Sequence, residues 1–276
     1  MDLTPRRGTP GRQVGRVRLP ARRADGKDER TQMLTILNYH RLVENDPVSF
    51  YDLSFDTFAN QMRRLAAVGN TAEDIYLDTD DLGKMCVTFD DGTEGHYKAA
   101  SLLESIGMRG IFFIVTGNLG REGYLSASQV SEMARAGHII GSHTVTHRQL
   151  PKLSIEEVRS ELVASRQILA DLVERDVLWL APPGGAYNAE VLSLAAESGY
   201  DVVRSMDWGY ATWPPEGHVP CLPVLPRYGP AGFDGLISGR APLWRYHVKR
   251  MIKASLGESR YVRLRDRLSA PRPNRN

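Results

Sequence analysis

The sequence contains little cysteine and no long apolar segment. Cys86 and Cys221 are the two cysteines in 276 residues, which excludes a disulfide-stapled scaffold. Both lie within apolar runs, so we expect buried free thiols rather than a disulfide or a pair of metal ligands. No uncharged apolar stretch approaches the about eighteen residues that a membrane-spanning helix needs. Internal repeats and low-complexity blocks are also absent from the sequence.

The first thirty residues lack any apolar cluster. They are rich in Arg, Gly and Pro and contain no hydrophobic core of a secretory signal. We therefore expect a disordered basic arm over residues 1–32 and a cytoplasmic location. Met33 stands directly before the first strand-like run, so an alternative is that the arm is an artefact of the choice of start site.

The distribution of charge argues against nucleic acid as the substrate. Residues 1–30 carry nine Lys or Arg against four acids, and residues 249–276 carry nine against two. The remaining residues, 31–248, hold seventeen basic and twenty-seven acidic side chains, a formal balance of −10. A core of this sign repels a polyanion.

The central part of the chain has the pattern of one parallel α/β domain. With 42% hydrophobic and 25% charged residues, the chain can bury the core of a single catalytic domain, which we place at 33–242. Short apolar runs alternate with longer amphipathic stretches. Strands are expected at 34–39, 85–89, 110–115, 138–141, 177–181, 201–204 and 222–226. Helices are expected at 55–68, 97–106, 126–136, 154–174, where Ser154 and Glu157 form a capping box, and 192–198.

Two adjacent carboxylates follow the apolar run 85–89. Asp90 and Asp91 precede Gly92, so both acids would lie at the C-terminal rim of a strand, where α/β folds bind ligands. Because neighbouring strand residues point in different directions, one carboxylate can bind a metal while the other handles protons. Considered alone, Asp-Asp-Gly is more often a simple turn.

A second motif lies about fifty residues further on. His143 and His147 are four residues apart, a spacing that puts both imidazoles on one side of a helical turn. With one carboxylate they would form a three-ligand metal site that keeps positions open for water, as catalytic sites do. A lone pair of histidines at this spacing is more often incidental.

Taken together, Thr88-Phe89-Asp90-Asp91-Gly92 and His143-Thr144-Val145-Thr146-His147 resemble the first two motifs of the polysaccharide deacetylases, the NodB-homology or carbohydrate esterase family 4 group. The resemblance extends over about residues 33–240. It implies a distorted (β/α)7-type barrel of parallel strands with the site at their C-terminal face. It also implies Asp90 as general base and Asp91, His143 and His147 as ligands of a divalent metal, with zinc expected and cobalt, nickel or manganese as alternatives.

The third family motif is altered here. The segment 180–187 carries Ala181 where the family usually has an arginine that orients the base, and the late leucine-x-histidine motif is missing. However, Asn38-Tyr39-His40-Arg41-Leu42 resembles the Tyr-His motif of the circularly permuted poly-N-acetylglucosamine deacetylases. Leu225-Pro226-Arg227-Tyr228 is similar to the segment that carries their late arginine.

The resemblance to the permuted branch implies His40 as general acid and Arg227 as the residue that orients Asp90. The residues themselves leave alternatives open, because His40 could be a core histidine bonded to backbone and Arg227 could form an ordinary surface ion pair. We further expect Tyr187 and Pro183 to line the acetyl pocket. Trp208 and Trp213 could offer apolar faces to a sugar ring, or they could serve in packing alone.

These parts predict a metal-dependent amide hydrolase. The expected substrate is an N-acetylhexosamine unit, such as N-acetylglucosamine, in a glycan or glycan precursor, with release of acetate. The alternatives are hydrolysis of a non-sugar amide on the same fold and a non-catalytic glycan-binding module. Binding alone does not require both Asp90 and Asp91, so the last reading is the least favoured.

Residues 243–276 lie beyond the resemblance and predict a basic amphipathic helix and tail. Leu243, Trp244, Val248, Met251, Ile252 and Leu256 fall close to one helical face, with basic residues on the flanks and the opposite side. Such a helix, over residues 243–256, can contact the anionic inner face of a membrane peripherally. The alternative is a helix that docks on the barrel with its basic side in water.

Overall fold

A computed structural model describes residues 32–44, 47–49, 51–68, 77–79, 83–225 and 229–240, together with 243, 248 and 251. Residues 1–31 of the predicted arm therefore lie outside the described residues, as do Trp244 and most of the predicted C-terminal helix. Leu243 packs against the core, whereas Val248 and Met251 are exposed. The membrane contact of this segment stays a prediction. None of the helices in the described part of the chain has the length and apolar character that a membrane span requires.

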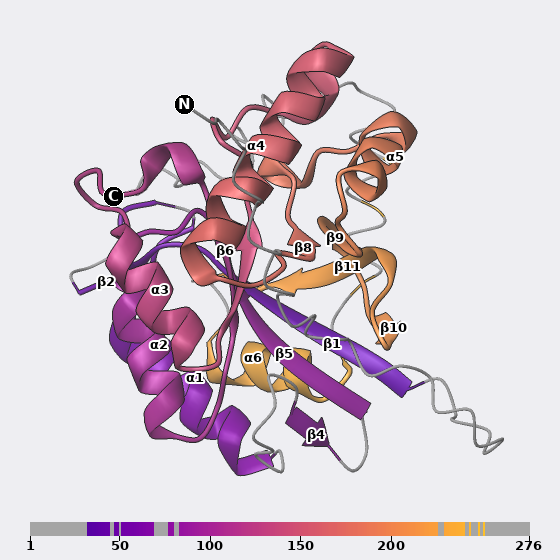
Figure 1. The fold of residues 1–276 in the computed structure, drawn as a ribbon. Helices are drawn as coiled ribbons and strands as arrows, with labels where there is room; N and C mark the ends of the chain where they lie inside the picture. Colours follow the sequence, from indigo (N-terminus) through magenta and orange to yellow (C-terminus); the bar gives the residue numbers. More distant parts are fainter. Residues whose placement is uncertain are drawn as a thin grey trace, which may run out of the picture.

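Seven parallel strands form a closed barrel (Figure 1). Around the barrel, each strand pairs with the next, and β1 pairs with both β11 and β5, which closes the ring. The strands are β1 (Gln32–Tyr39), β5 (Gly83–Phe89), β6 (Ile111–Ile114), β7 (Ile139–Ser142), β8 (Trp179–Leu180), β9 (Val202–Trp208) and β11 (Gly217–Pro223). The predicted (β/α)7-type barrel is confirmed, and every predicted barrel strand overlaps an observed one.

Four shorter strands were not predicted. They are β2 (Leu42–Val43), β3 (Leu53–Ser54), β4 (Leu77–Thr79) and β10 (Ala211–Trp213). The first two pair with each other, whereas β4 and β10 extend the barrel wall antiparallel to β5 and β1. Unlike the equally short β8, which lies within the apolar run 177–181, these strands of two or three residues lie outside such runs, so sequence did not reveal them.

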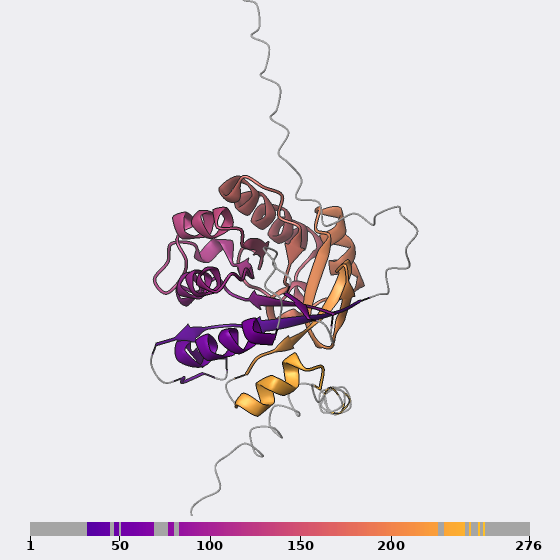
Figure 2. The same ribbon diagram turned by 90° about the horizontal axis from the view of Figure 1, so that it is seen from below.

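Helices cover the outside of the barrel. They are α1 (Phe55–Val68), α2 (Gly95–Ser105), α3 (Ala127–Arg135), α4 (Ile155–Val173), α5 (Ala189–Glu197) and α6 (Pro230–Ile237), with short 3-10 turns η1 (Thr116–Asn118), η2 (Leu150–Lys152) and η3 (Pro183–Gly185). The predicted capping box of Ser154 and Glu157 opens α4. The unpredicted α6 contains one proline and two glycines, which hide its helical pattern. It lies beside α1 (Figure 2), where Arg64 pairs with Asp234.

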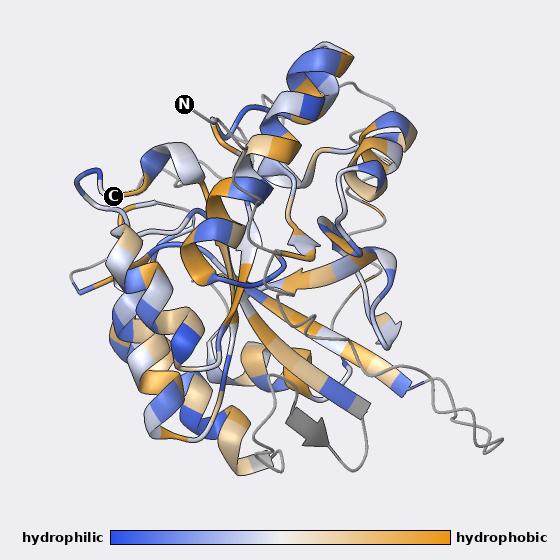
Figure 3. Ribbon diagram, in the orientation of Figure 1, coloured by the Kyte–Doolittle hydropathy of each residue, from blue (hydrophilic) through white to orange (hydrophobic). Residues whose placement is uncertain are grey.

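The core has two parts because alternate strand residues face the barrel interior and the helices. The strands are mainly apolar, whereas the helices show both apolar and polar residues (Figure 3). The smaller cluster, inside the barrel, includes Ile36, Cys86, Phe113, Trp179 and Cys221. Both cysteines are buried and free, as predicted. Burial raises the pKa of Cys221 to about 11 and that of Cys86 further.

Candidate active site

The two adjacent carboxylates at the end of β5 have different surroundings. The backbone N–H of Asp90 donates to the carbonyl of Tyr39 at 3.0 Å, and the residue is 2% exposed. Asp91 has a φ of 78° and Gly92 a φ of 69°, so the chain turns sharply and aims the second carboxylate away from the first. The Asp91 side chain is 31% exposed. One acid is therefore buried and the other faces the open rim, and the left-handed turn, rather than alternation along a strand, separates them.

Asp91 lies between the two motif histidines. Its Oδ1 is 3.1 Å from Nε2 of His147 and 3.4 Å from Nε2 of His143. One ligand atom from each residue falls within 4.8 Å of the others. Burial would raise the pKa of Asp91, but the two facing imidazoles outweigh this effect and hold the pKa well below its usual range. Two imidazoles and an ionised carboxylate suit a divalent ion that keeps further positions open.

The tautomer of His143 suits metal binding. Its Nδ1 lies 2.5 Å from the carbonyl oxygen of Ala181, which can only accept, so Nδ1 carries the proton. Nε2 faces Asp91 and, in this neutral tautomer, would supply its lone pair to a metal ion. Such a backbone partner is the usual way in which proteins orient a ligating histidine. Ala181 cannot replace the family arginine, but its carbonyl oxygen has this separate role.

The expectation that His143 and His147 share a helical turn is wrong. They lie in a loop after β7, in which Thr144 and His147 adopt left-handed φ values of 68° and 60°. This local geometry, rather than helical spacing, brings the two imidazole centroids to 4.9 Å. Non-glycine residues pay a conformational cost in this region, so the surroundings must hold the loop in place.

Glu161 on α4 holds this loop. Its Oε2 accepts from the backbone N–H of Val145 at 2.8 Å and of Thr146 at 2.9 Å, and its Oε1 accepts from the Thr146 hydroxyl. Burial alone would raise the pKa of Glu161, but these hydrogen bonds lower it overall. The carboxylate is therefore charged and bonded to the backbone between the two histidines.

Arg204 on β9 is the partner of Asp90. Its Nη2 donates to Oδ1 of Asp90, and the two side chains are 1% and 3% exposed. The guanidinium lies 4.8 Å from the centre of the Phe113 ring, inside the barrel. Burial pushes the pKa of Asp90 upward, but the charges of Arg204 and of nearby histidines lower it overall. Asp90 is thus held as a carboxylate, the form that accepts a proton.

Sequence analysis did not single out Arg204. The available signal was an arginine inside the apolar run Val202-Val203-Arg204, since a charge at an inward strand position needs a buried partner. Arg227, which the resemblance gave this role, lies outside the described residues, so that assignment is untested. A second contact fixes Asp90, because Asn38 Nδ2 donates to its Oδ2 at 3.2 Å.

His40 lies directly after β1 at the same rim. Its Nε2 is 3.7 Å from Oδ2 of Asp90, and its side chain is 15% exposed. Burial lowers the pKa of His40, although the two carboxylates oppose the shift. The neighbouring His96 is fully buried, and its Nε2 donates to the backbone carbonyl of His40 at 2.6 Å. The histidine bonded to backbone in this region is therefore His96, while the His40 ring faces Asp90.

The predicted substrate-binding residues occupy varied positions. Pro183 is buried at the start of η3, and the Tyr187 hydroxyl donates to Asp207 at 2.6 Å. Trp208 ends β9 at the catalytic rim and is half-buried. Their contacts with an acetyl group or sugar stay predictions. By contrast, Trp213 pairs with Gln32 at the opposite end of the barrel, so it cannot contact a sugar at this site.

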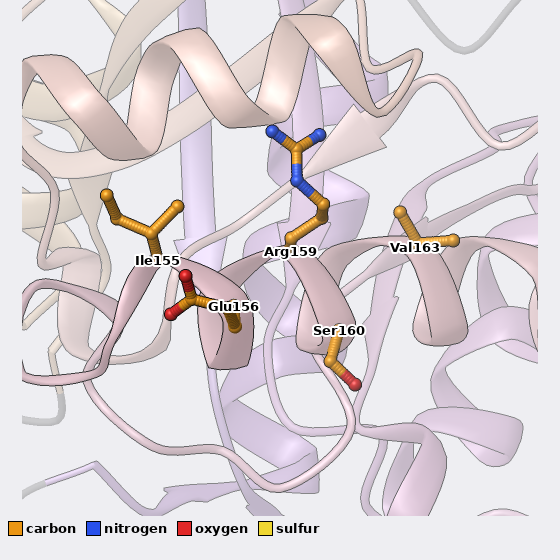
Figure 4. A pocket seen from close by; sticks show the side chains of 5 residues that line it. All are labelled: Ile155, Glu156, Arg159, Ser160 and Val163. Atoms are coloured by element: carbon orange, nitrogen blue, oxygen red, sulfur yellow. The ribbon is translucent and has the colours of Figure 1, made fainter.

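A separate depression lies along α4, outside the catalytic set. It is lined by Ile155, Glu156, Arg159, Ser160 and Val163 (Figure 4). These residues include no histidine and only one carboxylate, so the depression has no ligand set for a metal.

Comparison with known sequences agrees with this geometry. Residues 79–203 match the family model described as polysaccharide deacetylase. A peptidoglycan-N-acetylglucosamine deacetylase of Bacillus cereus is 30% identical over 121 residues, which are 43% of this chain and 54% of the relative. The peptidoglycan-N-acetylmuramic acid deacetylase PdaA of Bacillus subtilis is 31% identical over 149 residues, which are 51% of each. The chain thus spans about half the length of the curated relatives it matches.

Solved structures share the fold. The deacetylase PplD of Streptococcus pyogenes, in complex with acetate, superposes with a TM-score of 0.67 at 22% identity and covers 77% of this chain and 100% of its own. IcaB from Ammonifex degensii gives a TM-score of 0.60 at 24% identity over 76% of this chain and 97% of its own. At these identities the likeness establishes the shared barrel.

Proposed function

The chain contains a polysaccharide deacetylase domain, and from this premise we propose that it hydrolyses the acetamide of an N-acetylhexosamine unit and releases acetate. The observation that carries the proposal is that a candidate general base and a candidate metal-ligand set lie side by side at one rim of the barrel. The charge-paired base Asp90 stands beside the ligand set of Asp91, His143 and His147. A metal-dependent amide hydrolase uses both sets, whereas a binding module needs neither.

Asp91, His143 and His147 would hold a divalent metal, for which we expect zinc. A metal there lowers the pKa of a water molecule and polarises the acetamide carbonyl. Two observations support this assignment: the Ala181 carbonyl orients the His143 ring, and the depressed pKa of Asp91 keeps that carboxylate in the ionised form that binds a cation.

Asp90 serves as the general base in this proposal and removes the proton of the attacking water. Arg204 and Asn38 each bond one of its oxygens, so the carboxylate is fixed in orientation and kept ionised. His40 then donates a proton from Nε2 to the departing amine, which would otherwise be too basic to leave. His96 supports that step by fixing the backbone of His40. The products are acetate and a free amine.

We infer the class of substrate from the names of two relatives. They are named as deacetylases of peptidoglycan N-acetylglucosamine and N-acetylmuramic acid, which supports an acetylated amino sugar here. We test this with metal-reconstituted protein, N-acetylglucosamine oligomers and an enzymatic assay for acetate. Asp90→Asn, with its fold verified by circular dichroism at the assay temperature, serves as the matched inactive control. Acetate release from the oligomers that Asp90→Asn abolishes supports the proposal. Acetate release only from non-sugar acetamides would replace it with the non-sugar amidase.

A further inference from the structure

An exposed aromatic ring stands beside the proposed general acid. Tyr51 lies in the turn before β3 and is 46% exposed. Its ring centroid is 4.5 Å from that of His40, with 33° between the two planes. The described part of the chain exposes few large apolar side chains, and Tyr51 is the one among them that contacts a residue of the proposed catalytic set.

The turn that carries Tyr51 is firmly anchored. Asp52 is 1% exposed, and its Oδ2 accepts from the backbone N–H of Val48 at 3.2 Å and of Ser49 at 3.0 Å. Its Oδ1 pairs with Nε of Arg41 at 3.1 Å. Arg41 follows His40 directly, so one buried carboxylate ties the turn to the segment that carries the acid. The Tyr51 ring is therefore presented to solvent in a fixed position before any ligand binds.

The chemistry of the reaction places the sugar next to this ring. His40 must reach the amide nitrogen, and in an N-acetylhexosamine that nitrogen is bonded to a carbon of the pyranose ring. Asp90 occupies the interior side of His40, so the pyranose must lie toward solvent, where Tyr51 stands. An aromatic ring is amphipathic, and its apolar face suits the C–H face of a sugar while its hydroxyl stays wet.

We propose that Tyr51 contacts the pyranose ring that bears the acetamide and so selects sugar acetamides over other amides. The inference rests on the proposed function, because it takes His40 as the donor to the leaving amine. It also names a residue that would determine which acetamides the protein accepts. A small acetamide without a sugar ring would reach Asp90 and His40 but would not extend to Tyr51.

The test compares two substrates in matched variants. Tyr51→Ala is expected to raise KM for an N-acetylglucosamine pentamer about tenfold with little change in kcat, whereas kcat/KM for N-methylacetamide, which has no ring to reach Tyr51, should not change. Tyr51→Phe keeps the ring and should behave as wild type. Ile168→Ala, at an exposed apolar position on α4, controls for loss of surface area alone. Thermal unfolding of each variant verifies that the fold is retained.

An equal loss of kcat/KM for both substrates in Tyr51→Ala would overturn the proposal, because Tyr51 would then act through His40. A loss for neither substrate would overturn it as well. Binding of the pentamer to the Asp90→Asn protein, measured by calorimetry, separates this inference from the proposed function. If the pentamer binds and Tyr51→Ala weakens binding about tenfold, Tyr51 contacts the sugar even when wild type releases no acetate. If the pentamer does not bind, the Tyr51 proposal is wrong.

Discussion

Replacing Arg204 with methionine removes the buried cation that faces Asp90, and we expect the free energy of unfolding to fall by about 3–5 kcal/mol. Both side chains are almost completely buried, so the remaining carboxylate would lose its partner without gaining water. For a protein of this size, about 2–4 °C of Tm accompanies each kcal/mol, which corresponds to a decrease of roughly 10 °C. Urea unfolding followed by circular dichroism measures the change.

The double variant Asp90→Asn, Arg204→Met is the decisive control. Asp90→Asn alone leaves the cation unpaired and should also destabilise strongly, but the double variant contains neither charge. We expect it to recover most of the lost stability while turnover stays absent, because an amide cannot accept the proton. This separates the structural contribution of the pair from its role in chemistry.

Arg204→Lys tests geometry rather than charge. Lysine keeps the positive charge but lacks the planar fork, so the protein should stay folded while acetate release falls about 10²-fold. A single Arg204→Met variant that is as stable as wild type would refute the reasoning. The buried carboxylate would then have another counter-ion, and Arg227 would be the first residue to examine.

Four further outcomes are expected. His147→Ala should lose bound metal, measured by atomic absorption, whereas Asp90→Asn keeps the metal and loses turnover. His40→Ala should reduce turnover about 10²–10⁴-fold with metal retained, and near-normal activity would exclude it as the acid. Glu161→Ala leaves two backbone N–H groups of the histidine loop without a partner, which should cost about 2–5 kcal/mol and weaken metal affinity in a cobalt titration; unchanged affinity would contradict the role of the loop. Burial lowers the pKa of His96 to about 4, against about 6.5 in the unfolded chain, so the unfolded state binds a proton first as the pH falls. The free energy of unfolding should therefore fall by about 3 kcal/mol between roughly pH 6.5 and pH 4. In acid unfolding experiments, His96→Gln should not show this decrease.

Much of the barrel could be predicted because its signals are local. The run 85–89 is apolar and ends in Asp90 and Asp91, so the strand and its catalytic rim are adjacent in sequence. The capping box at Ser154 fixed the start of α4, and the 3.6-residue pattern fixed both ends of α1. Each of these features depends on residues within one element.

The parts that sequence missed depend on closure of the barrel or on single backbone angles. Arg204 lies 114 residues from Asp90, and only the closed ring of strands places their side chains face to face. The histidine loop was mistaken for a helical turn because nothing in Thr144 or His147 signals a left-handed φ. Tertiary contacts from Glu161 impose that conformation.

The two buried thiols provide an intrinsic probe of barrel opening. Cys86 and Cys221 face the interior on β5 and β11, the two strands that flank β1 at the closure of the ring, and both are at most 1% exposed. Their raised pKa values leave almost no thiolate at neutral pH. An alkylating reagent can therefore react with them only after the barrel strands separate and expose the thiols. The labelling rate of the unmodified protein thus reports how often the ring opens. Metal or substrate that stabilises the rim would slow the labelling, which offers a ligand assay that needs no turnover.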